Sequence, residues 1–168
     1  MKRLVLIISI LLYVPAFAAT QGNTVSKSGI TSVINECRSI EGAELVRLGR
    51  VATAALKVTL RTAAIGDRDA REALSVMKGI KGITVLDFED CSVADKARIA
   101  RKLERTLSGS EMLMEANDGG DKMMIYGVVD EKSGTVGDFV LYSPSDCALV
   151  CLFGTISMDA VAKLASDD

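Results

Sequence analysis

The hydrophobic pattern is clearest near the C-terminus, where Cys147 to Phe153 form an unbroken apolar run. The run is too short for a buried helix; turn-forming residues precede it at 143–146, and Gly154 follows it. Such a run is typical of a strand that is covered on both faces. We therefore predict a strand over Cys147–Ile156 in the interior of a sheet, and the rest of the chain is expected to be organised around it.

Three further strand-like segments precede this run and are separated by turn signals. They are predicted at 111–116, 122–130 and 135–142. The Asn-Asp-Gly-Gly sequence at 117–120 is typical of a hairpin connection, and Gly134 ends a second one. Four consecutive hairpin-linked strands predict an antiparallel meander.

Helical periodicity is present in three segments upstream of the meander, at 41–64, 68–78 and 93–107. The third segment begins with Ser92 followed by Asp95, which is the capping-box spacing. Its apolar stripe is predicted at Val93, Ala97, Ala100, Leu103 and Leu107.

Two shorter segments predict strands near the N-terminus. Gly29–Asn35 is rich in β-branched residues, and Ile83–Phe88 is continuously strand-like. Ser157 or Asp159 can cap a short final helix. The predicted fold class is α+β, with an antiparallel four-stranded C-terminal meander plus one or two N-terminal strands. The helices are expected to pack mainly on one face, and a short helix closes the chain.

The N-terminus has the three parts of a secretory signal peptide. It has a basic start, an apolar run from 4 to 14 and an Ala-x-Ala site that ends at Ala18. A membrane-spanning helix needs about 20 apolar residues, so we expect cleavage rather than retention as an anchor. We expect residues 1–18 to be a cleaved signal peptide, 19–28 a flexible mature N-terminus and 29–166 a single α+β domain. The protein is expected to be periplasmic or otherwise extracytoplasmic.

Composition narrows the function classes. The 168 residues include no His, and the net charge of −2 becomes −4 once Lys2 and Arg3 are removed. Without His, Ser-His-Asp and Cys-His catalysis and His-containing zinc sites are excluded. A mildly acidic chain with 4% aromatic residues is a poor fit to nucleic-acid binding. We expect a protein without catalysis, cofactor or metal, and without a transmembrane segment after signal removal.

The four cysteines, at 37, 91, 147 and 151, are the main chemical feature. Cys147 and Cys151 lie on one predicted strand with Cα atoms roughly 13 Å apart, whereas a disulfide needs about 4.4–6.8 Å. These two are expected to be buried structural thiols. Cys37 and Cys91 each follow a predicted strand. If those strands are parallel neighbours joined by a helical crossover, the two cysteines meet at one sheet edge and can form a disulfide. Free thiols are the default expectation, and this bridge is the alternative to it.

An alternative function is a thiol- or metal-dependent enzyme centred on Cys91. This cysteine precedes a capped helix, whose dipole favours the thiolate, and Lys96 or Glu89 could act as a base. The surrounding carboxylates offer oxygen ligands for a divalent cation. They are Asp87, Glu89, Asp90 and Asp95. A strand end followed by a helix start explains the same residues without a metal.

Two other groups of side chains have a functional and a structural interpretation. A basic series on the predicted helix over 41–64 is either an anion-binding face or a solvated face. It consists of Arg47, Arg50, Lys57 and Arg61. A methionine group is either core or, if one sheet face is open, a binding surface. It consists of Met112, Met114, Met123 and Met124.

Several stretches resemble a known family. The motifs are Met112–Gly120, Met124–Tyr126 and Leu149–Ile156, together with Gly29–Val33 and Lys81–Leu86 nearer the N-terminus. They resemble a family of exported bacterial proteins of Gram-negative envelopes, catalogued as domain of unknown function 4252. The resemblance spans nearly the whole mature domain and concerns packing and turn patterns. It implies export and an α+β fold, and it supplies no activity and no catalytic residues.

We therefore expect an exported, soluble, non-catalytic envelope protein that acts through protein–protein contacts. The partner is expected to be another envelope protein or a second copy of the chain. An open sheet face or an unpaired edge strand would be the contact surface. Binding of a small ligand between sheet and helices is a further alternative.

Overall fold

A computed structural model describes residues 27–118 and 120–158. The helices in these ranges are α2 (Lys27–Cys37), α3 (Arg50–Ala63), α4 (Arg68–Met77) and α5 (Val93–Leu107). The strands are β1 (Glu44–Leu48), β2 (Ile80–Asp87), β3 (Met112–Asp118), β4 (Asp121–Asp130), β5 (Thr135–Ser143) and β6 (Ala148–Ser157). None of these helices is long and apolar enough to cross a membrane. The expected signal peptide and the predicted C-terminal helix lie outside the described residues.

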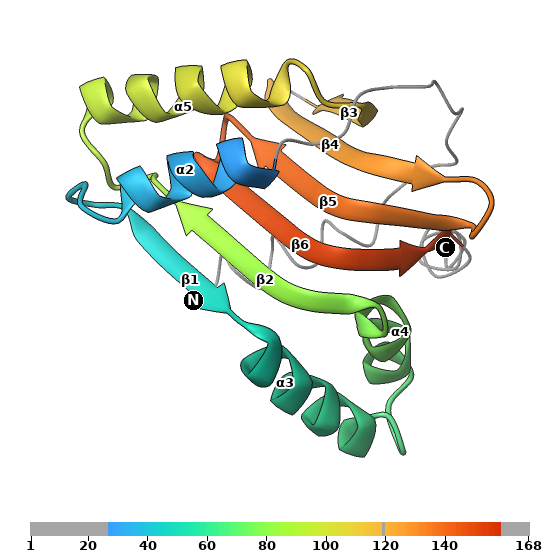
Figure 1. The fold of residues 1–168 in the computed structure, drawn as a ribbon. Coiled ribbons are helices and arrows are strands. Elements are labelled where there is room, and N and C mark those ends of the chain that lie inside the picture. Colours follow the sequence, from blue (N-terminus) through green and yellow to red (C-terminus); the bar gives the residue numbers. More distant parts are fainter. Residues whose placement is uncertain (1–26, 119, 159–168) are drawn as a thin grey trace.

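The six strands form one sheet in the order β1-β2-β6-β5-β4-β3, and every neighbouring pair is antiparallel (Figure 1). Strands β3 to β6 are the predicted meander, which is thereby confirmed. Strand β6 pairs with β2 on one side and with β5 on the other. The prediction of an interior strand at 147–156 is also confirmed, and so is the α+β fold class.

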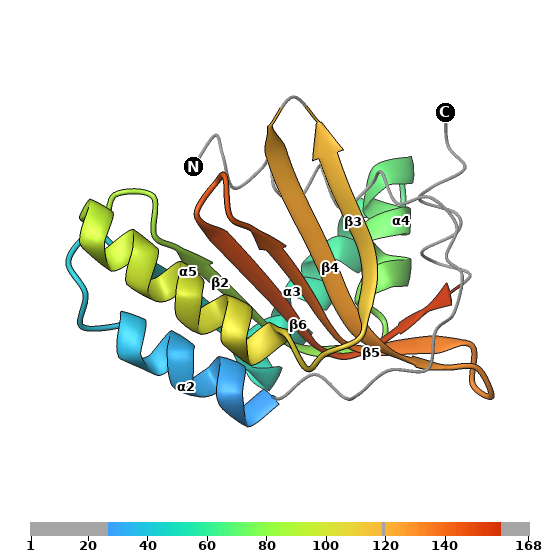
Figure 2. The ribbon, with the colours of Figure 1, turned by 90° about the horizontal axis from the view of Figure 1, so that it is seen from above.

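Each face of the sheet has its own apolar core. Along β6, Leu149 and Cys151 belong to the core beneath α2 and α5, whereas Val150 and Leu152 belong to the opposite one. Helices α2 and α5 lie side by side over the first face (Figures 1 and 2). Helices α3 and α4 contact the other core, where Met77 of α4 is buried. Strand β6 is continuously apolar because both of its faces are covered.

The strand predicted over Gly29–Asn35 is instead the helix α2, so this prediction is wrong. The buried residues of α2 recur every three or four positions, at Ile30, Val33, Ile34 and Cys37. A β-branched residue favours a strand by at most about 1 kcal/mol, and burial of this helical stripe against the sheet and α5 outweighs that preference. Helix α2 also begins at Lys27, inside the segment 19–28 that was expected to be flexible.

The helix predicted over 41–64 divides into β1 and α3, so its first part was predicted wrongly. Leu45 and Leu48 fit a helical spacing, but β1 pairs with the outer edge of β2, with Leu45 opposite Leu86. Gly49 has an extended backbone and separates the two elements. A three-residue spacing within five residues does not distinguish a helix from a short edge strand, and the hydrogen bonds to β2 decide between them.

The helix predicted over 93–107 is confirmed as α5, and the Ser92 Oγ accepts a hydrogen bond from the Asp95 backbone N–H at 3.1 Å. Its buried stripe is Ile99, Leu103 and Leu107. Val93 is 84% exposed and Ala97 is also exposed, so their places in the predicted stripe are wrong. The buried stripe begins at Ile99, nearly two turns into the helix.

Candidate docking surface and thiol cluster

Helix α3 is apolar on two opposite sides. Leu56 and Leu60 pack inward against the core on the second face of the sheet. Because successive helical residues turn by about 100°, Val51 and Val58 lie on the side away from that core. They are 86% and 60% exposed, and Ile65 in the following turn is 86% exposed.

We call this surface the outer face of α3. Its members have the spacing four-three-four-three, at Val51, Ala55, Val58, Thr62 and Ile65. All of them are exposed. A helix that is apolar on both sides is typically covered on both sides, so the outer face is a candidate docking surface.

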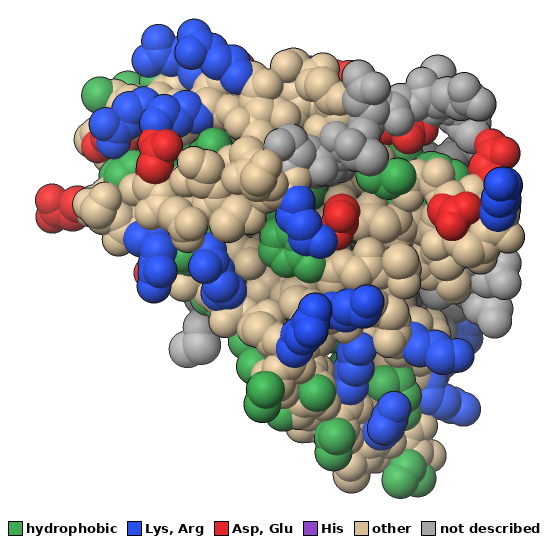
Figure 3. Space-filling view, in the orientation of Figure 1, with side chains coloured by type: hydrophobic (Ala, Val, Ile, Leu, Met, Phe, Trp, Pro, Cys, Tyr) green, Lys and Arg blue, Asp and Glu red, His purple; other side chains and the backbone are tan. Residues whose placement is uncertain are grey.

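Positive charge borders the outer face of α3. Residues 45–66 contain the four cations of the basic series and no Asp or Glu. Figure 3 shows Lys and Arg side chains gathered where α3 meets the sheet, with hydrophobic side chains along the helix. One member of the series has a structural role, because Lys57 Nζ donates hydrogen bonds to the carbonyl oxygens of Lys78 at 3.1 Å and Ile80 at 2.6 Å.

Three of the four cysteines lie at one end of the molecule. Cys37 ends α2 and Cys91 precedes α5, and these two helices run side by side in opposite directions (Figures 1 and 2). Both are buried in the same core, and Cys147 packs against it. Gly42, with φ +84°, brings the loop after α2 against the backbone of Cys91.

All four cysteines are free thiols. Cys37 does not follow the first of two parallel strands, as the bridge prediction assumed, because it is the last residue of helix α2. The antiparallel helices bring the two cysteines to the same end of the molecule by a different route. A bridge between them stays a prediction.

The thiols are held in their neutral form. Burial raises the pKa of Cys37 to about 11, with Cys91 as a further cause, and raises the pKa of Cys151 to about 12. Burial also raises the pKa of Cys91; Asp95 adds to this increase and Lys96 opposes it. A raised pKa disfavours the thiolate that a thiol enzyme requires.

Cys147 and Cys151 pack toward the same core as Leu149. Cys151 is fully buried, whereas Cys147 is half-buried. Cys147 has φ +52° and stands just before β6, and its Sγ lies 3.7 Å from the carbonyl oxygen of Pro144. Burial is thus complete for one of the two predicted structural thiols and partial for the other.

The carboxylates near Cys91 take part in a turn and a helix cap. Asp87 accepts a hydrogen bond from the Glu89 backbone N–H at 2.9 Å. Asp95 accepts one from the Ser92 hydroxyl at 2.6 Å and pairs with Arg98 at 2.8 Å. Among the described residues, no group of three or more His, Cys, Asp or Glu side chains is placed to hold a metal ion.

A groove of about 430 Å³ runs between α2 and α5. Cys37 lies in its lining, together with two ion pairs. Lys102 pairs with Glu36 and Arg98 pairs with Asp95. The lining also includes Glu41, so three carboxylates face two cations and both cations of this groove are compensated.

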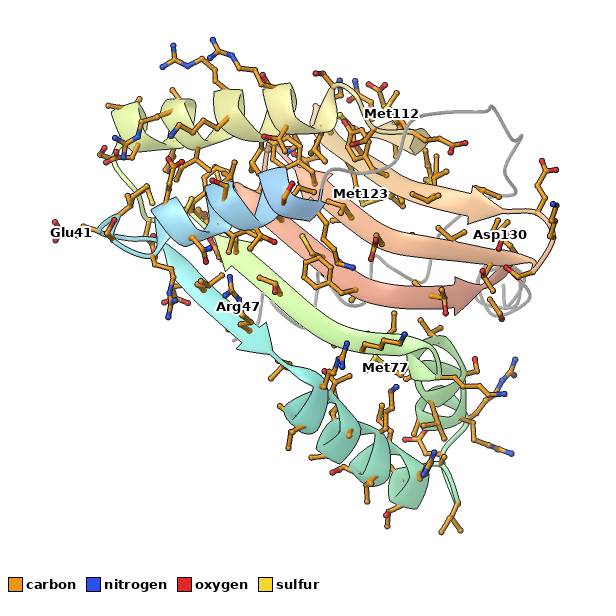
Figure 4. The ribbon with its side chains drawn as sticks, in the orientation of Figure 1. Glu41, Arg47, Met77, Met112, Met123 and Asp130 are labelled. Carbon is orange, nitrogen blue, oxygen red and sulfur yellow. The ribbon has the colours of Figure 1, made fainter. Side chains whose placement is uncertain are left out.

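The methionine group is divided between the two cores and the sheet edge. Met124 is buried beneath α5 and accepts a hydrogen bond from the Tyr126 hydroxyl at 3.3 Å. Met114 and Met123 pack against the opposite core. Met112, on the edge strand β3, is an exposed member of the group (Figure 4 labels Met112 and Met123). Most of the group therefore has a packing role.

Sequence reasoning missed the outer face of α3. For the helix predicted over 41–64 only the basic series was considered as a functional face, and its exposed aliphatic positions were not. The signal that could have found the outer face was the second stripe itself, because Val58 and Ile65 continue a spacing that begins at Val51. Two stripes on one helix predict two contact surfaces.

The fold is that of an α+β protein built on a six-stranded antiparallel sheet, with helix α3 at the β1–β2 edge. The chain belongs to the family described as domain of unknown function (DUF4252), whose model matches residues 57–164. The match confirms the family resemblance for the motifs from Lys81 onward, whereas Gly29–Val33 lies outside the matched residues. No curated protein and no solved structure matches the chain.

Proposed function

We propose that the protein is an exported, non-catalytic envelope protein that binds another protein through the outer face of α3. The supporting observation is the row of aliphatic side chains at Val51, Val58 and Ile65, each more than half exposed. Burying such a side chain contributes roughly 1.5–3 kcal/mol. In the isolated chain these side chains stay exposed, so the free energy of burying them is available for binding a partner.

The partner that fits this face is an amphipathic helix with acidic residues beside its apolar stripe. The four-three spacing of the outer face is the spacing at which one helix packs against another. Arg50, Lys57 and Arg61 lie along one border of that face. A second copy of α3 would bring two such basic borders together, and their repulsion disfavours self-association.

Export and the absence of catalysis are parts of the same proposal. The sequence pattern at 1–18 favours export. The lack of His and the raised pKa of Cys91 both oppose the thiol-enzyme alternative. Docking through α3 needs neither a reactive group nor a metal.

The test compares two matched substitutions in the tagged mature chain. Val58→Glu places a charge in the outer face of α3, and Val93→Glu makes the same change at an exposed position of α5. After cross-linking in envelope extract, we expect an envelope protein to be enriched by the wild type and by Val93→Glu. Val58→Glu is expected to lose it, because a buried charge in the interface is costly. Circular dichroism checks that both variants are folded.

Two results would contradict the proposal. An unchanged set of captured proteins with Val58→Glu would show that the outer face is not the docking surface. A dimer in light scattering that Val58→Glu dissociates would show that the face binds a second copy. In that case the charge argument for an acidic partner would be wrong.

A further inference from the structure

We infer that a basic pocket between α2, the β1–β2 edge and the start of α3 binds a small soluble molecule that carries a phosphate monoester. The pocket has a volume of about 510 Å³. It is distinct from the outer face of α3, and the inference does not rest on the proposed function. Four cations from four different elements line it: Lys27 of α2, Arg47 of β1, Arg50 of α3 and Lys81 of β2.

Among the described residues, no Asp or Glu side chain lines this pocket. Lys27 is neutralised, because its Nζ pairs with the Asp138 carboxylate at 2.8 Å. In the part of the chain that the structure describes, Arg47 forms no ion pair and donates to the neutral amide oxygen of Asn35 at 3.2 Å; Figure 4 shows it reaching from β1 toward α2. Within the described residues, Arg50 and Lys81 form no ion pair. Three positive charges therefore surround one hollow without compensation.

This arrangement differs from the groove between α2 and α5 in the same molecule. There Arg98 and Lys102 each pair with a carboxylate. Like charges around a common hollow repel one another, and a surface without a ligand is normally mixed in sign. The imbalance at the basic pocket is what an anion would relieve.

The backbone adds to the same positive potential. Helix α3 begins at Arg50, and Gly49 before it has no side chain to cap the first N–H groups. Gly49 and Arg50 both line the pocket. The uncapped amides at a helix N-terminus carry a partial positive charge and favour phosphate. Because Gly49 and Arg50 lie in the lining, this partial charge is located at the wall of the cavity.

The pocket is larger than a phosphate group and has an apolar side. Its volume lies in the range of small-molecule sites, about 300–1,000 Å³. Phe153 and Leu48 are in the lining, and Lys27 Nζ lies 5.2 Å from the centre of the Phe153 ring. The guanidinium groups of Arg47 and Arg50 are suited to bidentate contact with phosphate. A dianion with a compact organic group fits three uncompensated charges better than a monoanion does.

Calorimetric titration of the mature chain with phenyl phosphate tests this inference. Benzoate serves as the monoanion of similar size and phenol as the neutral analogue. We expect phenyl phosphate to bind at least about tenfold more tightly than benzoate. The double variant Arg50→Gln, Lys81→Gln is expected to bind phenyl phosphate at least about tenfold more weakly than the wild type. The matched control Arg105→Gln, Lys132→Gln removes the same charge elsewhere and should leave the affinity unchanged.

A second variant tests the apolar side of the pocket. Phe153→Leu should lower the affinity for phenyl phosphate but leave the affinity for inorganic phosphate unchanged, because only the ester has a ring that packs against Phe153. Val58→Glu should bind phenyl phosphate like the wild type, which separates this site from the proposed docking surface.

Three results would overturn the inference. If both double variants lost the same affinity for phenyl phosphate, the effect would be one of net charge alone. Equal affinity for phenyl phosphate and benzoate would exclude a site for a dianion. Binding to phosphatidylglycerol vesicles without binding to phenyl phosphate would show that the basic pocket serves a lipid surface and not a soluble ligand.

Discussion

Cys151 places an ionisable thiol in the middle of β6, where no water reaches it. Burial raises its pKa to about 12, whereas burial is only partial at Cys147, four residues earlier. The unfolded chain exposes both thiols, so each ionises there near its ordinary pKa of 9.0. The folded protein therefore retains a proton on Cys151 that the unfolded chain releases first as the pH rises.

This difference predicts an alkaline loss of stability. The contribution of Cys151 is fully present below pH 9 and is lost as the pH rises toward 12. Between about pH 8 and about pH 10, the unfolding free energy of the wild type should fall. That of Cys151→Ala should fall less, and the difference between the two proteins should be on the order of 1 kcal/mol. Urea unfolding at the two pH values measures it, with Cys147→Ala as the control. Equal pH dependence of all three proteins would contradict the buried thiol.

At the scale of the elements, the end of α4 and strand β6 come close together at two glycines, Gly79 and Gly154. Gly79 follows α4, and its carbonyl oxygen accepts a hydrogen bond from the Thr155 N–H at 3.2 Å. Gly154 has φ +129°, and a Cβ there would lie 2.3 Å from that same carbonyl oxygen. The bend of β6 beside the start of β2 thus needs a residue without a side chain.

Gly154→Ala should therefore destabilise the protein. Both the positive φ and the contact with Gly79 oppose a side chain, and each strained residue costs roughly 1–3 kcal/mol. The control is Gly109→Ala, where a Cβ would enter open space after α5. It should change stability by less than about 0.5 kcal/mol. Thermal unfolding of the two variants compares them, and similar melting temperatures would contradict the close approach.

At the scale of the whole molecule, the helices cover different parts of the sheet. Helices α2 and α5 cover one face of the sheet and enclose Cys37, Cys91 and Cys151 in a single core. Helix α3 lies away from them at the β1–β2 edge and presents its outer face to solvent (Figure 1). The thiol end and α3 thus lie in separate parts of the molecule.

The state of the thiols is linked to export, because disulfides persist outside the cytoplasm. In protein purified from the envelope of a Gram-negative host, we expect the intact mass of a chain that begins at Ala19. If Cys37 and Cys91 are bridged, alkylation in denaturant without reductant modifies only the other two cysteines, and with reductant all four. Four modified cysteines without reductant would exclude the bridge. An intact mass that retains residues 1–18 would contradict signal cleavage.

Local signals in the sequence determined the meander and α5. The Asn-Asp-Gly-Gly turn and the Ser92–Asp95 cap act over a few residues, so their outcome does not depend on the rest of the fold. The continuous apolar run at 147–153 predicted an interior strand for the same reason, since only a strand with both faces covered can bury it. The sequence also predicted the family, through these same packing and turn motifs.

Tertiary structure decided the rest. The β-branched segment at 29–35 becomes a helix because its stripe is buried against α5 and the sheet, and 44–48 becomes a strand because the edge of β2 is available for pairing. The candidate sites depend on the same long-range placement. Lys27 and Lys81 are more than fifty positions apart in the chain, and only the packing of α2 over β2 brings them into one pocket. Local sequence patterns do not predict that two such distant residues line one pocket, because this depends on which faces of the helices and strands the whole chain buries.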